Sequence, residues 1–272
     1  HSFTQAKFGG SSIEFDGTND SLDIADSTDF DFGTGNFTFE FWVYKQTSGK
    51  MAIFETRPNG GNDQGFNLEF SSANKFEWYD TSIASGNDLP REGSAISLNT
   101  WTHYAVVRNG AICTMYRDGT SVGTPKNIGS NSQVSAGTPT IGESASGAND
   151  YQGYLDEIRI SNTNRYPDGT TFTPQTTAFT ADANTKLLIH SNWDGGLGAD
   201  SSGNYNTFTP TNLVATDQMI DTPTNNFCTL NPLVTPTDGT FAIGFTEGNL
   251  DAKNTSGVND WNGYVGTIGM SS

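Results

Sequence analysis

The chain has 272 residues, of which 30 are Asp or Glu and 13 are Lys or Arg, and its formal net charge is −17. Because phosphate binding requires clustered Lys and Arg, this balance argues against nucleic acid and against an anionic membrane surface as partners. No apolar run approaches the roughly 18 residues of a membrane span, and the start shows no signal-peptide pattern, so membrane insertion is not expected. Hydrophobic residues make up 33% of the chain, which is enough for a core and excludes disorder throughout.

The two cysteines, Cys113 and Cys228, lie far apart in the sequence. A disulfide framework would be denser and a zinc site would show paired spacing, so we expect both to be buried apolar residues. The chain opens on His1 rather than Met, which we interpret as the mark of a processed product.

Short alternating runs separated by turn residues recur about every 8–15 residues, a pattern typical of a β-sandwich. The clearest run covers 37–44, in which Phe37, Phe39, Phe41 and Val43 would form one apolar face. Further strands are expected at 13–15, 66–70, 76–79, 101–108, 111–116, 154–160 and 186–190. Asn109-Gly110 supplies the positive φ angles of a two-residue hairpin loop, and Asp118-Gly119 offers a second such turn.

Three stretches lie outside this series. Residues 162–182 are rich in Thr, Pro and Asn and read as a long surface connection. Residues 191–221 contain few apolar side chains and are expected to wrap the surface, whereas 222–272 carries two apolar β runs, 241–245 and 263–270. We therefore predict a sandwich over 1–190, a connection over 191–221 and a β extension over 222–272, which is too short to hold a core of its own.

Five segments in order resemble the laminin-G/pentraxin-like family of concanavalin A-like lectin/glucanase domains. They are IEFDGTND at 13–20, FTFEFWV at 37–43, LNTWTH at 98–103, YRDG at 116–119 and GYLDEIRI at 153–160. The resemblance implies an all-β, jelly-roll sandwich of two antiparallel sheets. The tail, with TPTNNFC at 222–228 and GTIGM at 266–270, resembles the start of a SPRY-like domain. Such arrangements are similar to tail fibres and other virion proteins of marine bacteriophages.

A structural Ca²⁺ site is one predicted feature, because loops of Asp, Asn and Gly supply the carboxylate and carbonyl oxygens that Ca²⁺ prefers. Asp16, Asn19 and Asp20 cluster in one turn. The resemblance implies that such a site bridges this loop and Asp156, with carbonyls near Gly33 and Gly35 completing the shell. Strict alternation places Asp156 on the strand face of Tyr154 and Ile158, towards the sandwich interior. The acidic turn is equally well explained by simple turn capping.

A ligand surface is the second predicted feature. Flat aromatic side chains can stack on sugar rings and loop side chains can donate or accept hydrogen bonds, although the same aromatics also suit a core. The candidate aromatic residues are Trp42, Tyr44, Trp78, Tyr79 and Tyr104. The candidate loop residues are Asn59, Asn62, Asp63, Asn87, Asp88, Asn149 and Asp150.

Catalysis has the weakest sequence support. A glycosidase needs two carboxylates that flank the scissile bond. Glu14 and Asp16 come nearest to this spacing, whereas Asp156 and Glu157, being adjacent, are expected to point to opposite faces. No Ser or Cys nucleophile motif accompanies the strand histidines His103 and His190. We therefore predict that the protein is not an enzyme.

The resemblance to phage fibre proteins implies a virion-surface or tail-fibre component that recognises a host carbohydrate or protein, or joins other virion subunits, and that forms a homo-oligomer such as a trimer. A carbohydrate-binding module of a secreted bacterial protein is the alternative, followed by a purely architectural domain. A glycoside hydrolase is less favoured than any of these.

Overall fold

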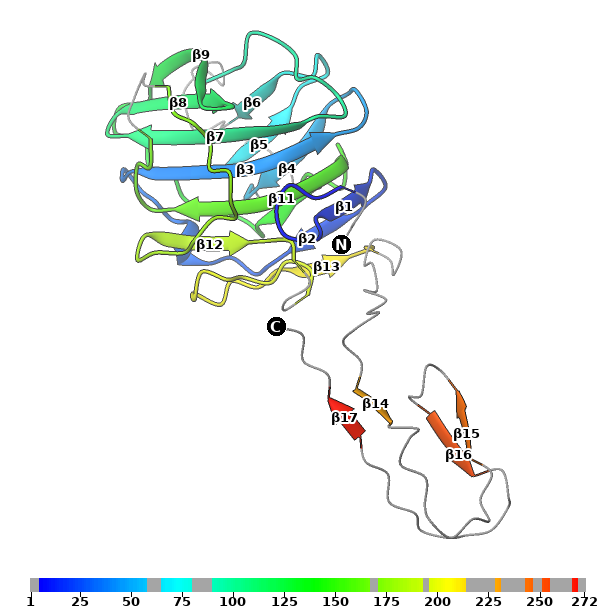
Figure 1. Ribbon diagram of the computed structural model, residues 1–272. Coiled ribbons are helices and arrows are strands. Elements are labelled where there is room, and N and C mark those ends of the chain that lie inside the picture. The colour runs from blue at the N-terminus through cyan, green and yellow to red at the C-terminus, as the bar shows by residue number, and fades with distance from the viewer. Residues whose placement is uncertain are drawn as a thin grey trace. The chain divides into compact units, whose positions relative to one another are not determined.

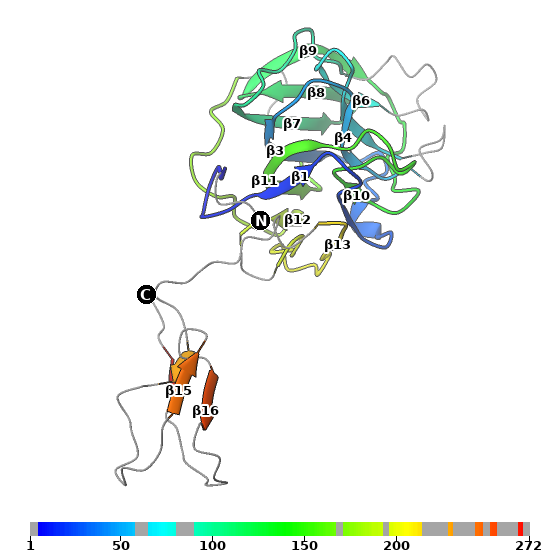
Figure 2. The ribbon, with the colours of Figure 1, turned by 90° about the vertical axis from the view of Figure 1, so that its right-hand side faces the viewer.

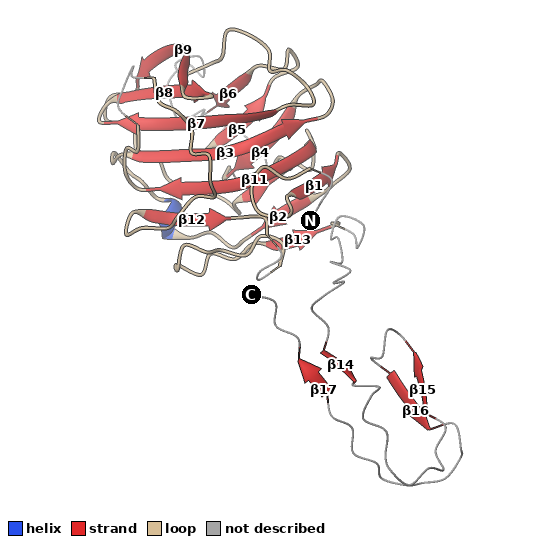
Figure 3. Ribbon diagram, viewed as in Figure 1, coloured by secondary structure: helices blue, strands red, loops and turns tan. Residues whose placement is uncertain are grey.

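The computed structural model describes residues 5–57, 65–79, 90–166, 171–192 and 196–213, together with the backbone of four short strands between 228 and 268 (Figure 1). By its internal contacts the chain divides into two compact units, His1–Met219 and Ile220–Ser272. The first unit is a sandwich of two antiparallel sheets, as predicted. Its one helix among the described residues is a single 3-10 turn, Thr28–Phe30 (Figure 3).

The larger sheet has seven strands in the order β1-β11-β3-β7-β8-β9, and β12 also pairs with β11 (Figure 1). Its strands are β1 (Ile13–Asp16), β3 (Phe37–Lys45), β7 (Trp101–Asn109), β8 (Ile112–Arg117), β9 (Thr120–Asn127), β11 (Gln152–Ser161) and β12 (Thr185–Ile189). The predicted hairpin is confirmed, but its two-residue loop is Gly110-Ala111, because Asn109 still pairs with Ile112 at the end of β7, and of the two residues predicted for this turn Gly110 alone has a positive φ, +59. The turn at Asp118-Gly119 leads into β9 with φ +48 and φ +77.

The smaller sheet has six strands in the order β13-β2-β10-β4-β5-β6. Its strands are β2 (Ser21–Asp23), β4 (Met51–Glu55), β5 (Asn67–Phe70), β6 (Phe76–Tyr79), β10 (Thr140–Ile141) and β13 (Thr209–Thr211). Figure 2 shows the two sheets as facing layers. The strand β13 comes from the stretch 191–221 that was expected to wrap the surface, and it forms one edge of this sheet by pairing with β2.

The core between the sheets consists largely of aromatic rings. Phe37, Phe39, Phe41 and Val43 of β3 all point inward and are at most 3% exposed, which confirms the predicted apolar face of that strand. The ring of Phe37 makes an edge-to-face contact with the ring of Trp78 in the opposite sheet, and the two ring centroids lie 5.5 Å apart. Contacts of this kind add favourable quadrupole interactions to the burial of apolar area.

The outer face of the seven-stranded sheet is covered by the chain between β11 and β12, which crosses the front of that sheet in Figure 1. We call residues 162–166 and 171–182 the strap. Phe179 of the strap packs on Trp42 and Leu188, while Tyr166 and Phe172 pack on Tyr116. The strap therefore gives the apolar residues on this face something to pack against.

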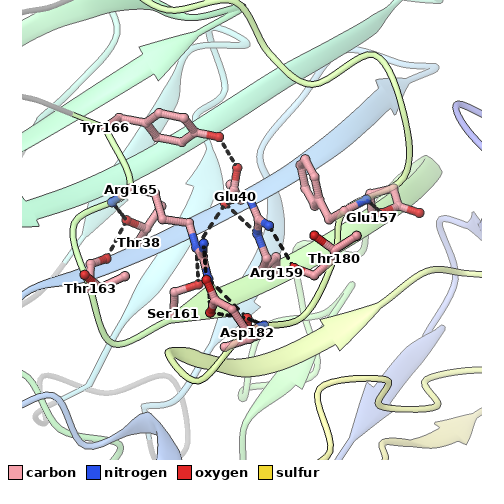
Figure 4. Close-up of polar contacts among 12 residues, drawn as sticks. Thr38, Glu40, Glu157, Arg159, Ser161, Thr163, Arg165, Tyr166, Thr180 and Asp182 are labelled. Atoms are coloured by element: carbon pink, nitrogen blue, oxygen red, sulfur yellow. Dashed lines mark hydrogen bonds and ion pairs between the residues drawn. The ribbon is translucent and has the colours of Figure 1, made fainter.

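A buried carboxylate fastens the strap to the sheet (Figure 4). Glu40 of β3 accepts hydrogen bonds from Arg159 Nε at 2.8 Å and from Tyr166 Oη at 2.6 Å. Burial alone would raise the pKa of Glu40, but the neighbouring His103, Arg159 and Tyr166 bring it below its ordinary value. Within the strap, Arg165 forms a bidentate salt bridge with Asp182.

In the second unit, β14 (Cys228–Leu230) pairs with β17 (Gly266–Ile268), and β15 (Ile243–Thr246) pairs with β16 (Asp251–Asn254). Two of these strands overlap the β runs predicted for the extension. Cys113 is buried in the core, as expected, whereas the side chain of Cys228 lies outside the described residues. Within the described part of the chain, no helix combines the length and apolar character needed to cross a membrane.

Candidate ligand groove

A row of polar side chains crosses the outer face of the six-stranded sheet. Cross-strand partners share a face of a sheet, and the register aligns Thr209 with Asp23, Asp23 with Thr140, Thr140 with Glu55, and Glu55 with Asn67. Their strand neighbours Leu22, Ile141 and Leu68 point the other way, into the core. The outer face of this sheet is therefore polar across five strands.

A groove of about 390 Å³ lies over one end of this row. It is lined by the strand residues Ser21, Asp23, Thr140 and Thr211, and by the loop residues Glu143 and Ser144. Binding sites for small ligands commonly measure about 300–1,000 Å³. Its walls carry hydroxyls and carboxylates within one concave surface, so the groove can bind a polyhydroxylated ligand through several hydrogen bonds.

Local hydrogen bonds hold the groove's side chains in place. Asp23 Oδ2 accepts from Ser21 Oγ at 2.7 Å and from Thr211 Oγ1 at 2.8 Å, which ties β13 to β2 at the groove's edge. The loop that carries Glu143 and Ser144 is anchored to the sheet, because the amide of Ala145 donates to Glu55 Oε2 at 3.2 Å. A ligand would thus meet a surface whose polar groups are already positioned.

The groove contains more negative than positive charge. Arg57 is the single cation among the described residues that line it, and its Nε and Nη2 both lie 2.6 Å from Glu55 Oε1. Burial raises the pKa of Glu55 despite this pairing. The pKa of Glu143 is raised by partial burial and by the nearby Asp150 and Asp23.

The family model of the concanavalin A-like lectin/glucanases superfamily matches residues 16–169, which is more than half of the chain. The chain belongs to this superfamily. The two-sheet sandwich described above is the fold that this membership implies, and the resemblance noted in the sequence is confirmed at the level of the superfamily.

Three solved structures show the range of similarity of this concanavalin A-like chain. A putative carbohydrate-binding protein from Bacteroides ovatus is 15% identical with a TM-score of 0.55, and the match covers 74% of this chain and 58% of that protein. A heptameric SAP-like pentraxin from Limulus polyphemus is 17% identical with a TM-score of 0.41, over 66% of this chain and 94% of the pentraxin. Domains LG4-5 of the mouse laminin alpha1 chain are 11% identical with a TM-score of 0.41, over 61% of this chain and 47% of the laminin chain. At these identities the likeness concerns the fold alone. No curated protein matches the chain in sequence.

Two of the predicted ligand-binding aromatics belong to the core of the concanavalin A-like sandwich. Trp78 and Tyr104 are both fully buried between the sheets, and the hydroxyl of Tyr104 donates to Glu92. These two assignments are corrected, because neither ring can meet a ligand. Trp42 does lie on the outer face of the larger sheet, but Phe8, Phe179 and Lys7 cover it.

The remaining predicted ligand residues fall into three groups. Tyr44 is half-buried on the outer face of the larger sheet, between Trp101 and Tyr154. Asp150 interacts with Glu143 at the groove, and its neighbour Asn149 accepts from the Ala52 amide through its carbonyl oxygen. Those that lie outside the described residues are Asn59, Asn62, Asp63, Asn87, Asp88 and the side chain of Tyr79.

The predicted metal ligands are only partly brought together. Asp20 accepts from the amide of Asp16, and Asn19 between them has φ +55, so these three residues form one tight turn. By contrast, the Gly33 carbonyl accepts from Arg108 Nη1 at 3.0 Å, and the Gly35 amide closes a turn onto Phe32.

Asp156 lies four residues along β11 from the partner of Asp16, about 13 Å at the usual strand rise. Among the described residues no group of three or more His, Cys, Asp or Glu side chains is arranged to hold a metal ion. The calcium site stays a prediction.

Asp156 faces outward, in contrast to the predicted orientation. A bulge interrupts β11 between Asp156 and Arg159, and Glu157 at the bulge has φ +52. The extra residue shifts the alternation, so that Ile158 enters the core whereas Asp156 lies beside Trp42 on the outer face.

The surroundings of the bulge account for its two carboxylates. Asp156 Oδ2 accepts from the amides of Lys7 and Phe8, and burial raises its pKa to about 7. Glu157 accepts from the amide of Phe179 in the strap and pairs with His190 at 3.0 Å. The two adjacent carboxylates therefore share the outer face, where opposite faces were expected.

The carboxylates considered for catalysis lie on the other sheet from the groove. Glu14 of β1 accepts from the Tyr154 hydroxyl at 3.0 Å, and Asp16 at the end of β1 accepts from the amide of Thr18. Sequence reasoning missed the groove residues, because β2, β10 and β13 have only two or three residues each, too few to show an alternation.

Proposed function

We propose that this protein is a non-catalytic recognition component of a virion surface or tail fibre, and that it binds a host carbohydrate through the groove on its six-stranded sheet. The observation that carries the proposal is the groove itself, about 390 Å³ in volume and lined by hydroxyls and carboxylates on a rigid sheet. Membership of the concanavalin A-like lectin/glucanases superfamily is consistent with a lectin-like role.

The chemistry of the groove suits a sugar. Sugar hydroxyls both donate and accept hydrogen bonds, and the groove offers acceptors at Asp23 and Glu143 and hydroxyls at Thr140 and Thr211. Because Asp23 is already oriented by Ser21 and Thr211, little conformational entropy is lost when a ligand binds.

The groove is tested by measuring glycan binding of the full chain on an array, beside a Thr140→Tyr variant. Thr140 lines the groove from β10, so a phenol ring at this position would fill the cavity and abolish binding. The matched control is Tyr205→Ala, which alters a side chain that is 87% exposed and does not line the groove. Binding that persists in a folded Thr140→Tyr variant, or no glycan binding by the natural chain, would count against the proposal.

The virion assignment is supported by the resemblance of the sequence segments to phage fibre proteins and needs its own test. We expect the chain to be a trimer by sedimentation and to be detected by mass spectrometry in purified phage particles. A monomer that binds polysaccharide would instead indicate the carbohydrate-binding module of a secreted bacterial protein. Self-association without any ligand would indicate an architectural domain.

Absence of catalysis is tested with the same glycans. Prolonged incubation should release no reducing ends. If the natural chain releases reducing ends and the Glu14→Gln or Asp16→Asn variant does not, the protein is a hydrolase and the non-catalytic part of the proposal is wrong.

A further inference from the structure

The charges around the groove point to a particular class of saccharide. Two carboxylates, Asp23 and Glu143, line the groove directly, and the electrostatic environment of Glu143 also includes Asp150 and Asp20. An anionic ligand placed there would face like charges, which is a common means by which proteins reject unwanted partners.

Arg57, the single cation among the described residues that line the groove, cannot compensate these carboxylates. The Arg57 side chain is 8% exposed, and its guanidinium is paired at 2.6 Å with Glu55, whose side chain is fully buried. A buried guanidinium that leaves its carboxylate would strand an unpaired buried charge, so Arg57 is held where it is. Its positive charge is largely cancelled by Glu55 and is not available to bind a ligand's carboxylate.

The neutral polar groups of the groove complete the argument. Ser21, Thr140 and Ser144 also line the groove, although each is at most 6% exposed, and their hydroxyls already donate to Asp23, Thr138 and Ala148, so they contribute polar surface without charge. Sugar hydroxyls can donate to Asp23 and Glu143 without adding charge. We infer that the groove selects neutral saccharides and rejects those that carry a carboxylate, such as sialylated or uronate-containing glycans. This inference rests on the proposed function and specifies its ligand class.

The experiment compares matched probes on one array, lactose beside 3′-sialyllactose and further pairs that differ only by the sialic acid. The full chain should bind the neutral member at least about tenfold more tightly, a difference of about 1.4 kcal/mol. Because the discrimination is electrostatic, the ratio should fall between roughly 50 mM and 500 mM salt as screening increases.

Two variants test whether the preference for neutral over sialylated glycans arises in the groove. Glu143→Gln and Asp23→Asn should each reduce the neutral-to-sialylated ratio by roughly threefold or more, since each removes one like charge while keeping a similar shape. The matched control is Asp182→Asn, which removes the same charge from the strap on the opposite sheet of the sandwich. It should leave the ratio unchanged.

The outcomes separate this inference from the function on which it rests. If no glycan binds, the proposed function fails and the inference fails with it. If sialylated glycans bind as well as neutral ones or better, the inference alone is overturned. A ratio that changes equally in Asp182→Asn and Glu143→Gln would trace the effect to net charge and overturn the assignment to the groove.

Discussion

At the residue scale, Lys45 shows how strictly the strand alternation acts. It continues the inward series Phe37, Phe39, Phe41 and Val43 and is therefore fully buried at the end of β3. Its ammonium donates to the carbonyls of Thr47 at 2.5 Å and Gly49 at 3.2 Å, and its Nζ lies 5.5 Å from the ring centroid of Phe70. Burial lowers the pKa of Lys45 to about 8.

This pKa predicts an alkaline effect on stability. Between about pH 8 and 10.5 the unfolded chain binds more protons at Lys45 than the folded chain, so this residue makes the free energy of unfolding rise with pH. Relative to a Lys45→Met variant, the natural chain should gain up to about 3 kcal/mol across this range. Denaturant unfolding at a series of pH values measures the difference.

A Lys126→Met variant serves as the control, because Lys126 lies on the exposed strand β9. Its stability should follow that of the natural chain at every pH. If the Lys45→Met curve also runs parallel to that of the natural chain, the ammonium of Lys45 does not titrate near pH 8 and the prediction is wrong.

Alternation accounts for both the success and the failure of prediction at this scale. The inward face of β3 follows directly from the period of two, since no bulge interrupts its pairing with β7. Asp156 was assigned to the wrong face because Glu157 adds a residue to β11, and no glycine stands at residues 156–159 to mark the bulge in the sequence. Trp78 and Tyr104 suited either a core or a surface until the packing of the two sheets decided between them.

At the scale of elements, Glu40 is a buried carboxylate that fastens the strap to the larger sheet. Besides the bonds from Arg159 and Tyr166, Glu40 lies 3.5 Å from His103 Nε2 and 3.9 Å from Arg165 Nε. The side chain of Glu40 is fully buried, whereas that of Asp182 at the strap's end is 48% exposed. Glu40 and Asp182 therefore both hold the strap in place, but Glu40 does so in the protein interior and Asp182 does so at the solvent-exposed surface.

We expect a Glu40→Gln substitution to lower the free energy of unfolding by about 3 kcal/mol, because it leaves the buried Arg159 without its counter-charge. Asp182→Asn should cost less than about 1 kcal/mol, since its ion pair is partly exposed to solvent. Hydrogen exchange should show faster opening of the strap in Glu40→Gln only. Equal losses in the two variants would contradict the assigned role of burial.

Elements with long alternating runs could be predicted from the sequence, and short polar ones could not. The strand β3 has nine residues with a clear apolar face, and the hairpin of β7 and β8 has a diagnostic turn. The strands β2 and β10 have three and two residues, and β13 is exposed throughout. These short strands owe their conformation to the neighbours with which they pair, and they are the strands that build the groove.

At the scale of the whole molecule, the groove exists only after distant segments have met. Ser21, Thr140 and Thr211 lie far apart in the sequence and become neighbours through the pairing of β2 with β10 and β13. Prediction of this site from one sequence would have required the strand order of the smaller sheet. The excess of carboxylates in the groove agrees with the composition of the chain, whose formal net charge is −17.

The extent of the sandwich can be tested by truncation. The core cluster includes Leu197 and Phe208, and Phe208 lies 6.5 Å from Phe30 between ring centroids. A chain that ends at residue 213 keeps these side chains and β13, so its melting temperature should stay within about 2 °C of that of the full chain. A chain that ends at residue 206 loses β13 and Phe208, which is 1% exposed.

Removal of a buried Phe typically costs about 3–5 kcal/mol, which corresponds to a fall of roughly 10 °C in a domain of this size. A chain that ends at residue 190, the boundary predicted from the sequence, also lacks Asp200, which accepts from the amide of Leu188 in β12. We expect this shortest chain not to unfold cooperatively. Calorimetry of the three truncated chains beside the full chain measures the order of their melting temperatures. If the chains that end at residues 206 and 213 melt at the same temperature, β13 is not an integral strand of the smaller sheet.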